Sequence, residues 1–192
     1  MSSILFRTKA SMHPAQEAGH LIAAGLGWAC TNMTYSNEER EWMTAGDVPV
    51  SIVWRESAVL SMFGGDWAIF ELLTGNPYRD IARKGYADGW REFAGKGRLN
   101  AEVFEIFNSR VPKYAQAAGS GQPVASPLTG FLAASVGISL ERLAETNSPE
   151  IAARVGYIDI LAQFVSAKFD ASYLTAANEL ADKGLIKRPQ TQ

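Results

Sequence analysis

Residues 149–169 read PEIAARVGYIDILAQFVSAKF and contain the clearest periodic pattern in the chain. Apolar residues recur there at alternating spacings of four and three, which is typical of one face of an α-helix: Ile151, Val155, Ile158, Ala162, Val165 and Phe169. Ile160, Leu161 and Phe164 widen this face. Ser148 and Pro149 indicate where the helix begins, because serine caps a helix well and proline fits its first position. We therefore expect this helix at the centre of a helical core.

The same start and stop signals recur along the chain. Prolines after His13, Asn76 and Ser126 mark further helix starts, and Ser36 with Glu39 has the spacing of a capping box. Glycines follow the apolar-periodic runs, as expected just past a helix end: Gly75, Gly95, Gly119, Gly137 and Gly184. Together these signals predict an all-α fold, a compact bundle of eight or nine helices.

Some boundaries are less clear than others. Residues 48–54 alternate like a strand, yet residues 57–63 have a helical pattern, and we assign a helix from near Val50. Asp66 is expected to cap a separate helix, and residues 149–169 and 171–183 are expected to form two helices. Two further helices are predicted, one capped by Asn100 and one over residues 140–146.

The length of 192 residues predicts one domain over residues 1–192. Residues 119–123, GSGQP, have the composition of a linker. The alternative is therefore two helical lobes, residues 1–118 and 124–192, joined by this segment.

Composition excludes several classes of protein. Eighteen Lys and Arg against twenty Asp and Glu give a net charge of −2, which is unlike a strongly basic nucleic-acid coat protein or a disordered acidic tail. Cys30 is the one cysteine, so no internal disulfide forms and a reducing compartment is favoured. The uncharged stretches are shorter than the roughly 20 residues that span a bilayer. We expect no membrane partner and a cytoplasmic location.

A stripe of arginine and aromatic residues is the first candidate site. Arg79, Arg83, Tyr86 and Trp90 lie on one side of a predicted helix, within residues 76–118, where eight basic and five acidic side chains give +3. These residue types are enriched at protein interfaces, which makes the stripe a candidate interaction surface. They also fit contact with nucleic acid, or arginine stems that cover aromatic core.

Two patterns near the N-terminus are further candidates. His13, Glu17 and His20 have the spacing of residues on one helix face, which is a possible metal site. A polar surface stripe is the simpler interpretation of the same spacing. Small residues occupy every fourth position of the same helix: Ala15, Gly19, Ala23 and Gly27. We expect this second stripe to contact another helix of the chain, with a homo-oligomer contact as the alternative.

Motifs that carry catalysis are scarce. The sequence has no phosphate-binding loop, no dinucleotide-binding glycine pattern and no nucleophile elbow. We therefore expect a non-enzymatic protein-binding module, such as a subunit, adaptor, inhibitor or immunity-type partner, with no cofactor. One alternative is a metal-dependent helical-bundle enzyme that uses His20 and Glu17. The other is a nucleic-acid-contacting protein that uses Arg79, Arg83 and Trp90.

Overall fold

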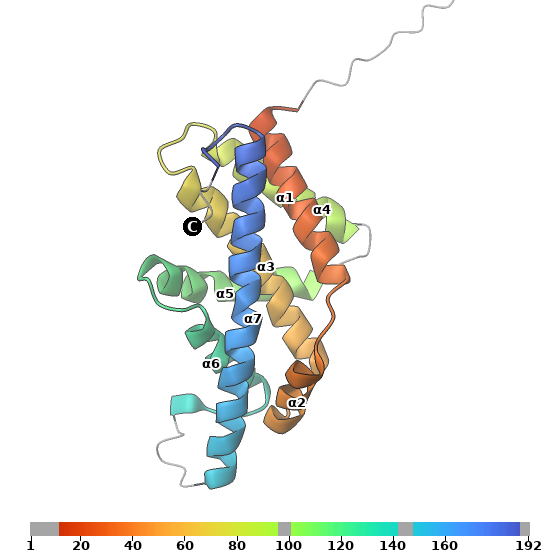
Figure 1. Ribbon diagram of the computed structural model, residues 1–192, viewed down its shortest axis with the longest axis vertical. Helices are drawn as coiled ribbons and strands as arrows, with labels where there is room; N and C mark the ends of the chain where they lie inside the picture. Colours follow the sequence, from red (N-terminus) through yellow and green to blue (C-terminus); the bar gives the residue numbers. More distant parts are fainter. Residues whose placement is uncertain (1–11, 96–100, 142–147, 189–192) are drawn as a thin grey trace, which may run out of the picture.

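All regular secondary structure is helical in the computed structural model, which describes residues 12–95, 101–141 and 148–188. These ranges contain seven α-helices and no strand (Figure 1): α1 Pro14–Thr31, α2 Asn37–Gly46, α3 Val50–Leu72, α4 Arg79–Gly95, α5 Ala101–Gly119, α6 Ala125–Ser135 and α7 Pro149–Asp182. The all-α prediction is confirmed. No helix among these residues is long and apolar enough to cross a membrane.

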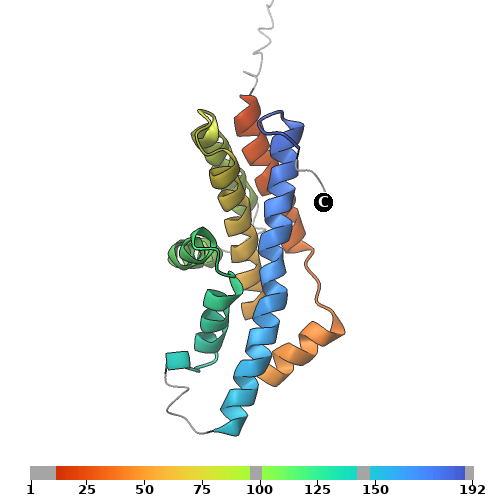
Figure 2. The ribbon, with the colours of Figure 1, turned by 60° about the vertical axis from the view of Figure 1, so that its left-hand side comes forward.

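The helix α7 runs the length of the bundle and packs against α1, α2, α3 and α6 (Figures 1 and 2). Ser148 caps it as predicted, since the side chain accepts a hydrogen bond from the amide of Ile151. Of the predicted apolar face, Ile158, Ala162 and Val165 are buried. Of the three residues expected to widen this face, Leu161 is buried, whereas Ile160 and Phe164 are exposed.

The predicted count of eight or nine helices is wrong for the part of the chain that the structure describes. Residues 50–72 form one helix where two were expected, and residues 149–182 form another. Gly64 and Gly65 do not end α3 but permit close packing. A Cβ on Gly64 would lie 2.6 Å from the carbonyl oxygen of Phe169, and one on Gly65 would lie 2.5 Å from the Tyr86 hydroxyl.

The alternation in residues 48–54 does not form a strand, because α3 begins at Val50. The capping box of Ser36 and Glu39 at the start of α2 is confirmed. The predicted cap at Asn100 lies outside the described residues, as does most of the helix predicted over residues 140–146.

Helices α1 and α4 pack at backbone contact. A Cβ on Gly19 of α1 would overlap the carbonyl oxygen of Ala82, and one on Gly85 of α4 would overlap that of Gln16. The small-residue stripe, Ala15, Gly19, Ala23 and Gly27, is buried in the chain. The expected contact with another helix is present, and a second subunit would have to displace α4 to reach the stripe.

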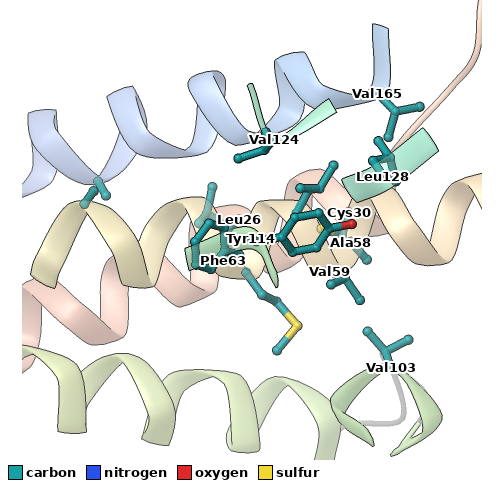
Figure 3. Packing of buried hydrophobic residues seen from close by; sticks show 14 of the residues in the cluster. Leu26, Cys30, Ala58, Val59, Phe63, Val103, Tyr114, Val124, Leu128 and Val165 are labelled. Carbon is teal, nitrogen blue, oxygen red and sulfur yellow. The ribbon is translucent and has the colours of Figure 1, made fainter. Parts of the chain in front are cut away.

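The core contains residues of all seven described helices, and Figure 3 shows a part of it. Phe63 of α3 is a central member. Its ring lies 5.7 Å from the ring of Trp67, 5.6 Å from that of Tyr114 and 5.5 Å from that of Phe169. These contacts bring α5 and α7 against α3.

A buried ion pair also holds α5 on α3. The carboxylate of Glu56, 1% exposed, accepts a hydrogen bond of 3.3 Å from Arg110. The Arg110 guanidinium lies 3.8 Å from the ring centroid of Phe131 on α6. Burial and the nearby charge of Glu56 raise the pKa of Tyr114 well above its usual value. The pair therefore fixes α5, which borders both hollows described below.

Candidate binding site

The predicted stripe on α4 does not form one continuous surface. Tyr86 and Trp90 are 4% and 2% exposed, whereas Arg79 and Arg83 reach the surface. The ring of Trp90 packs edge-on against both Tyr86 and Phe93. The two aromatic residues are therefore part of the core, beneath the level of the arginines.

Tyr86, Trp90 and Arg83 nevertheless meet at a hollow of about 470 Å³ between α3, α4 and α5. We call it the basic hollow. Its apolar lining is mostly aromatic and comprises Met62, Tyr86, Ala87, Trp90, Phe104 and Phe107. Its polar lining comprises Asp66, Arg83, Lys84, Arg91 and Asn108. Arg79 of the predicted stripe does not line the hollow.

The charged residues of this hollow differ in how firmly they are held. Arg83 donates two hydrogen bonds to Asp66, at 2.9 Å from Nε and 2.8 Å from Nη2. This hydrogen bonding raises the pKa of Arg83. Arg91 pairs with Asp88 at 2.6 Å. Lys84 is exposed and has no ion-pair partner among the residues that the structure describes. Lys84 is therefore the cation most available to a ligand.

The polar groups beneath the rim are satisfied within the protein. The hydroxyl of Tyr86 donates a hydrogen bond of 2.7 Å to the carbonyl oxygen of Met62. Burial raises the pKa of Tyr86 well above its usual value, so the hydroxyl stays neutral. This bond fixes the ring between α4 and α3. The result is a rigid apolar floor below a charged rim.

Several residues of the basic hollow were not assigned to a site from the sequence. Phe104 and Phe107 follow Asn100 in sequence, in the helix that Asn100 was expected to cap, and Met62 and Asp66 belong to segments predicted as separate helices. They come together only because α3 and α5 cross beside α4. No local pattern in the sequence indicates such a crossing.

The structure does not bring the predicted metal ligands together. His13 caps α1, where its Nδ1 accepts a hydrogen bond of 3.2 Å from the amide of Ala15. Glu17 pairs with Lys183 at 3.0 Å, and Nε2 of His20 lies 3.3 Å from Glu92. Within the described ranges, no group of three His, Cys, Asp or Glu side chains is placed to hold a metal ion.

The nucleic-acid alternative depends on Arg79, Arg83 and Trp90. Trp90 is 2% exposed, so little of its ring is open to a stacking base. Arg83 is engaged by Asp66, and Arg79 lies 5.3 Å from the ring centroid of Phe70. For contact with nucleic acid, these residues therefore offer two arginines that already contact other side chains, and one ring that is largely buried.

Cys30 lies in the core and its backbone oxygen accepts a hydrogen bond of 3.0 Å from Trp54. Burial raises the pKa of its thiol to about 11. A thiol in this environment is a packing group, since the thiolate is the reactive form. It adds nothing to either hollow.

Comparisons with protein-family models, with curated proteins and with solved structures found no match to this chain.

Proposed function

We propose that this chain is a non-enzymatic protein-binding module and that its basic hollow is the binding site. The hollow receives an apolar side chain of a partner protein, and acidic residues beside that side chain meet the cationic rim. One observation carries the proposal: an aromatic floor lies directly below three cations and one carboxylate. Such an arrangement fits an anchor side chain that is apolar and flanked by carboxylates.

The size of the hollow supports a side chain as the ligand. About 470 Å³ lies within the range of ligand pockets, and it exceeds what one aromatic or leucine side chain occupies. The floor is fixed, because Tyr86 is hydrogen-bonded and the rings of Trp90 and Phe93 pack edge to face. A rigid floor lowers the ordering cost of binding. Binding therefore orders little besides the anchor side chain itself.

The positive charge of the rim favours a partner with acidic residues beside its anchor side chain. The Lys84 ammonium group has no ion-pair partner in the described part of the chain, and the Arg83 guanidinium is held in place by Asp66. Arginine near aromatic residues is also frequent at interface hot spots. Under this proposal the buried, reduced state of Cys30 agrees with a cytoplasmic location.

Arg79 provides a matched control, because it lies on the same helix but outside the hollow. Synthetic peptides with a central leucine or phenylalanine, flanked by glutamates or by lysines, are titrated into the protein by calorimetry. We expect the glutamate-flanked peptides to bind more tightly. Lys84→Glu should weaken this binding at least about tenfold, which equals about 1.4 kcal/mol, whereas Arg79→Glu should change it less than about threefold.

A second variant tests the floor. Ala87 lines the hollow and is half-buried, so Ala87→Trp fills the space with a large ring. This variant should abolish peptide binding while its helical circular dichroism stays unchanged. Equal losses for Arg79→Glu and Lys84→Glu would show general charge attraction in place of a site. Unchanged binding by Ala87→Trp, or no preference between the peptides, would contradict the proposal.

A further inference from the structure

A second hollow, of about 490 Å³, lies between α3, α7 and the turn that joins α5 to α6. We call it the acidic hollow. Three aromatic residues line it, Trp67, Phe169 and Tyr173, together with the carboxylates of Glu71 and Asp170. Its lining contains no lysine, arginine or histidine. Aromatic faces and uncompensated carboxylates together are the chemistry that attracts a cation.

The aromatic rings are held in place from below. Buried Phe63 contacts Trp67 on α3 and Phe169 on α7, with ring centroids 5.7 Å and 5.5 Å apart. Phe169 in turn lies 6.4 Å from Tyr173. The three lining rings therefore belong to one connected aromatic group, anchored in the core. A ligand would therefore meet rings that are already held in place.

The carboxylates are available to a ligand. Burial, followed by the nearby carboxylate of Glu71, raises the pKa of Tyr173 to about 12, so the Tyr173 hydroxyl stays neutral beside Glu71. Both Glu71 and Asp170 are exposed, and neither forms an ion pair with any cation in the described ranges. One carboxylate comes from α3 and the other from α7, so both helices contribute charge.

We propose that the acidic hollow binds a trimethylammonium group. Such a group is a weakly hydrated cation that makes favourable contact with aromatic faces and is attracted by carboxylates. A bare lysine ammonium is strongly hydrated and gains less from the rings. The hollow has room for the whole head group. This site shares no lining residue with the basic hollow, so the proposal does not depend on the proposed function.

The probes are choline, its neutral isostere 3,3-dimethylbutanol, and a peptide that carries trimethyllysine, each titrated by calorimetry at one fixed ionic strength. Choline should bind at least about fivefold more tightly than the isostere, because the two differ in charge and not in shape. Tighter binding of the peptide than of choline indicates a protein-borne ligand. Equal or tighter binding of choline indicates a small molecule.

Three variants locate the binding. Trp67→Leu keeps the apolar contact but removes the ring, and should weaken choline binding at least about fivefold. Glu71→Gln and Asp170→Asn keep size and fold while removing charge. The double variant should also weaken choline binding at least about fivefold. Glu105→Gln, an exposed acid of α5 outside the hollow, should have no effect. Equal binding of choline and the isostere would overturn the proposal, as would unchanged choline binding by the Glu71→Gln/Asp170→Asn protein.

Discussion

The basic and acidic hollows lie on two sides of α3 and are built from similar floors. Met62 and Asp66 line the first, whereas Trp67 and Glu71 line the second. Asp66 and Trp67 are neighbours in sequence, yet they serve different hollows because successive helical residues point about 100° apart. Aromatic rings form both floors, and the two rims carry opposite charge. The small net charge of −2 therefore does not indicate that the surface has two hollows whose linings carry opposite charge.

The difference between the hollows also extends to their supports. The basic hollow depends on α4, which backbone contact with α1 holds in place. The acidic hollow depends on α7 and on the ring of Phe63. Only α3 and the α5 region contribute to both. Damage to α5 should therefore affect both hollows, and damage to the α1–α4 contact should affect one.

The largest expected effect follows loss of the buried ion pair. Arg110→Met removes the partner of Glu56, which is 1% exposed, and leaves a buried charge uncompensated. We expect a loss of about 3 kcal/mol, at the lower end of such losses because Arg110 itself is partly exposed. Chemical denaturation measures this loss, and binding at both hollows should weaken together.

The double variant Glu56→Gln/Arg110→Met is the control, since it removes both charges. It should recover most of the lost stability. A double variant as unstable as Arg110→Met alone would mean that the loss comes from packing on Phe131 and not from the unpaired carboxylate.

The second largest effect separates the two hollows. Gly19→Ala places a methyl group against the carbonyl oxygen of Ala82, so α1 and α4 must move apart. Such overpacking costs about 1–3 kcal/mol. Acidic-peptide binding at the basic hollow should weaken, whereas choline binding at the acidic hollow should stay within about twofold of wild type.

Gly25 is a matched control for this change, because it lies on the same helix with open space around its Cα. Gly25→Ala should stabilise the protein by about 0.5–1 kcal/mol, since alanine loses less freedom on forming a helix. Thermal melting compares the two variants directly. Equal melting temperatures would show that α1 and α4 are not in close contact.

A smaller effect is the response of each site to salt. Under the proposed function, the basic hollow binds through exposed charges, whose attraction is screened within about 10 Å at 0.1 M salt and about 3 Å at 1 M. Peptide affinity should fall about tenfold over this range. Choline contacts aromatic faces as well as carboxylates, so its affinity should fall only about twofold to threefold. Equal salt dependence of the peptide and choline affinities would contradict a contribution of the aromatic rings to choline binding.

The smallest effect concerns the tyrosine of each hollow. Tyr86 and Tyr173 have raised pKa values, mainly through burial, so the folded state retains protons that the unfolded state releases above pH 10. Stability is complete below pH 10 and is lost as the pH rises toward 12. Tyr86→Phe should reduce this alkaline loss more than Tyr173→Phe, since Tyr86 is the more deeply buried residue. Chemical denaturation at pH 10 and at pH 12 measures this loss of stability. Identical profiles for the two variants would contradict the prediction.

Local signals predicted the helices better than they predicted the site. The caps at Ser36 and Ser148 depend on residues close in sequence, and both are present. The small-residue stripe on α1 correctly indicated a close helix contact. The separate helix expected from Asp66 was wrong, because Gly64 and Gly65 allow close packing within α3 on partners about a hundred and about twenty residues away in sequence.

The predicted stripe on α4 shows why the site was only partly predicted. Periodicity places Arg83 and Trp90 on one side of a helix, but it does not show how deep that side lies in the bundle. Depth depends on how α4 packs against α1 and α3, and that packing leaves Trp90 2% exposed and Arg83 at the rim of the hollow. The acidic hollow was not predicted, since its rings come from α3 and α7 and meet only through Phe63.

The length and position of α7 have a consequence for synthesis on the ribosome. The buried faces of α1, α2, α3 and α6 all pack against α7, which occupies residues 149–182. Four helices therefore leave the exit tunnel before the helix that covers them has emerged. Chains of this kind expose apolar surface while they wait and are prone to aggregate. Slow codons late in the message would lengthen that exposure, and nascent-chain chaperones should associate until α7 has left the exit tunnel.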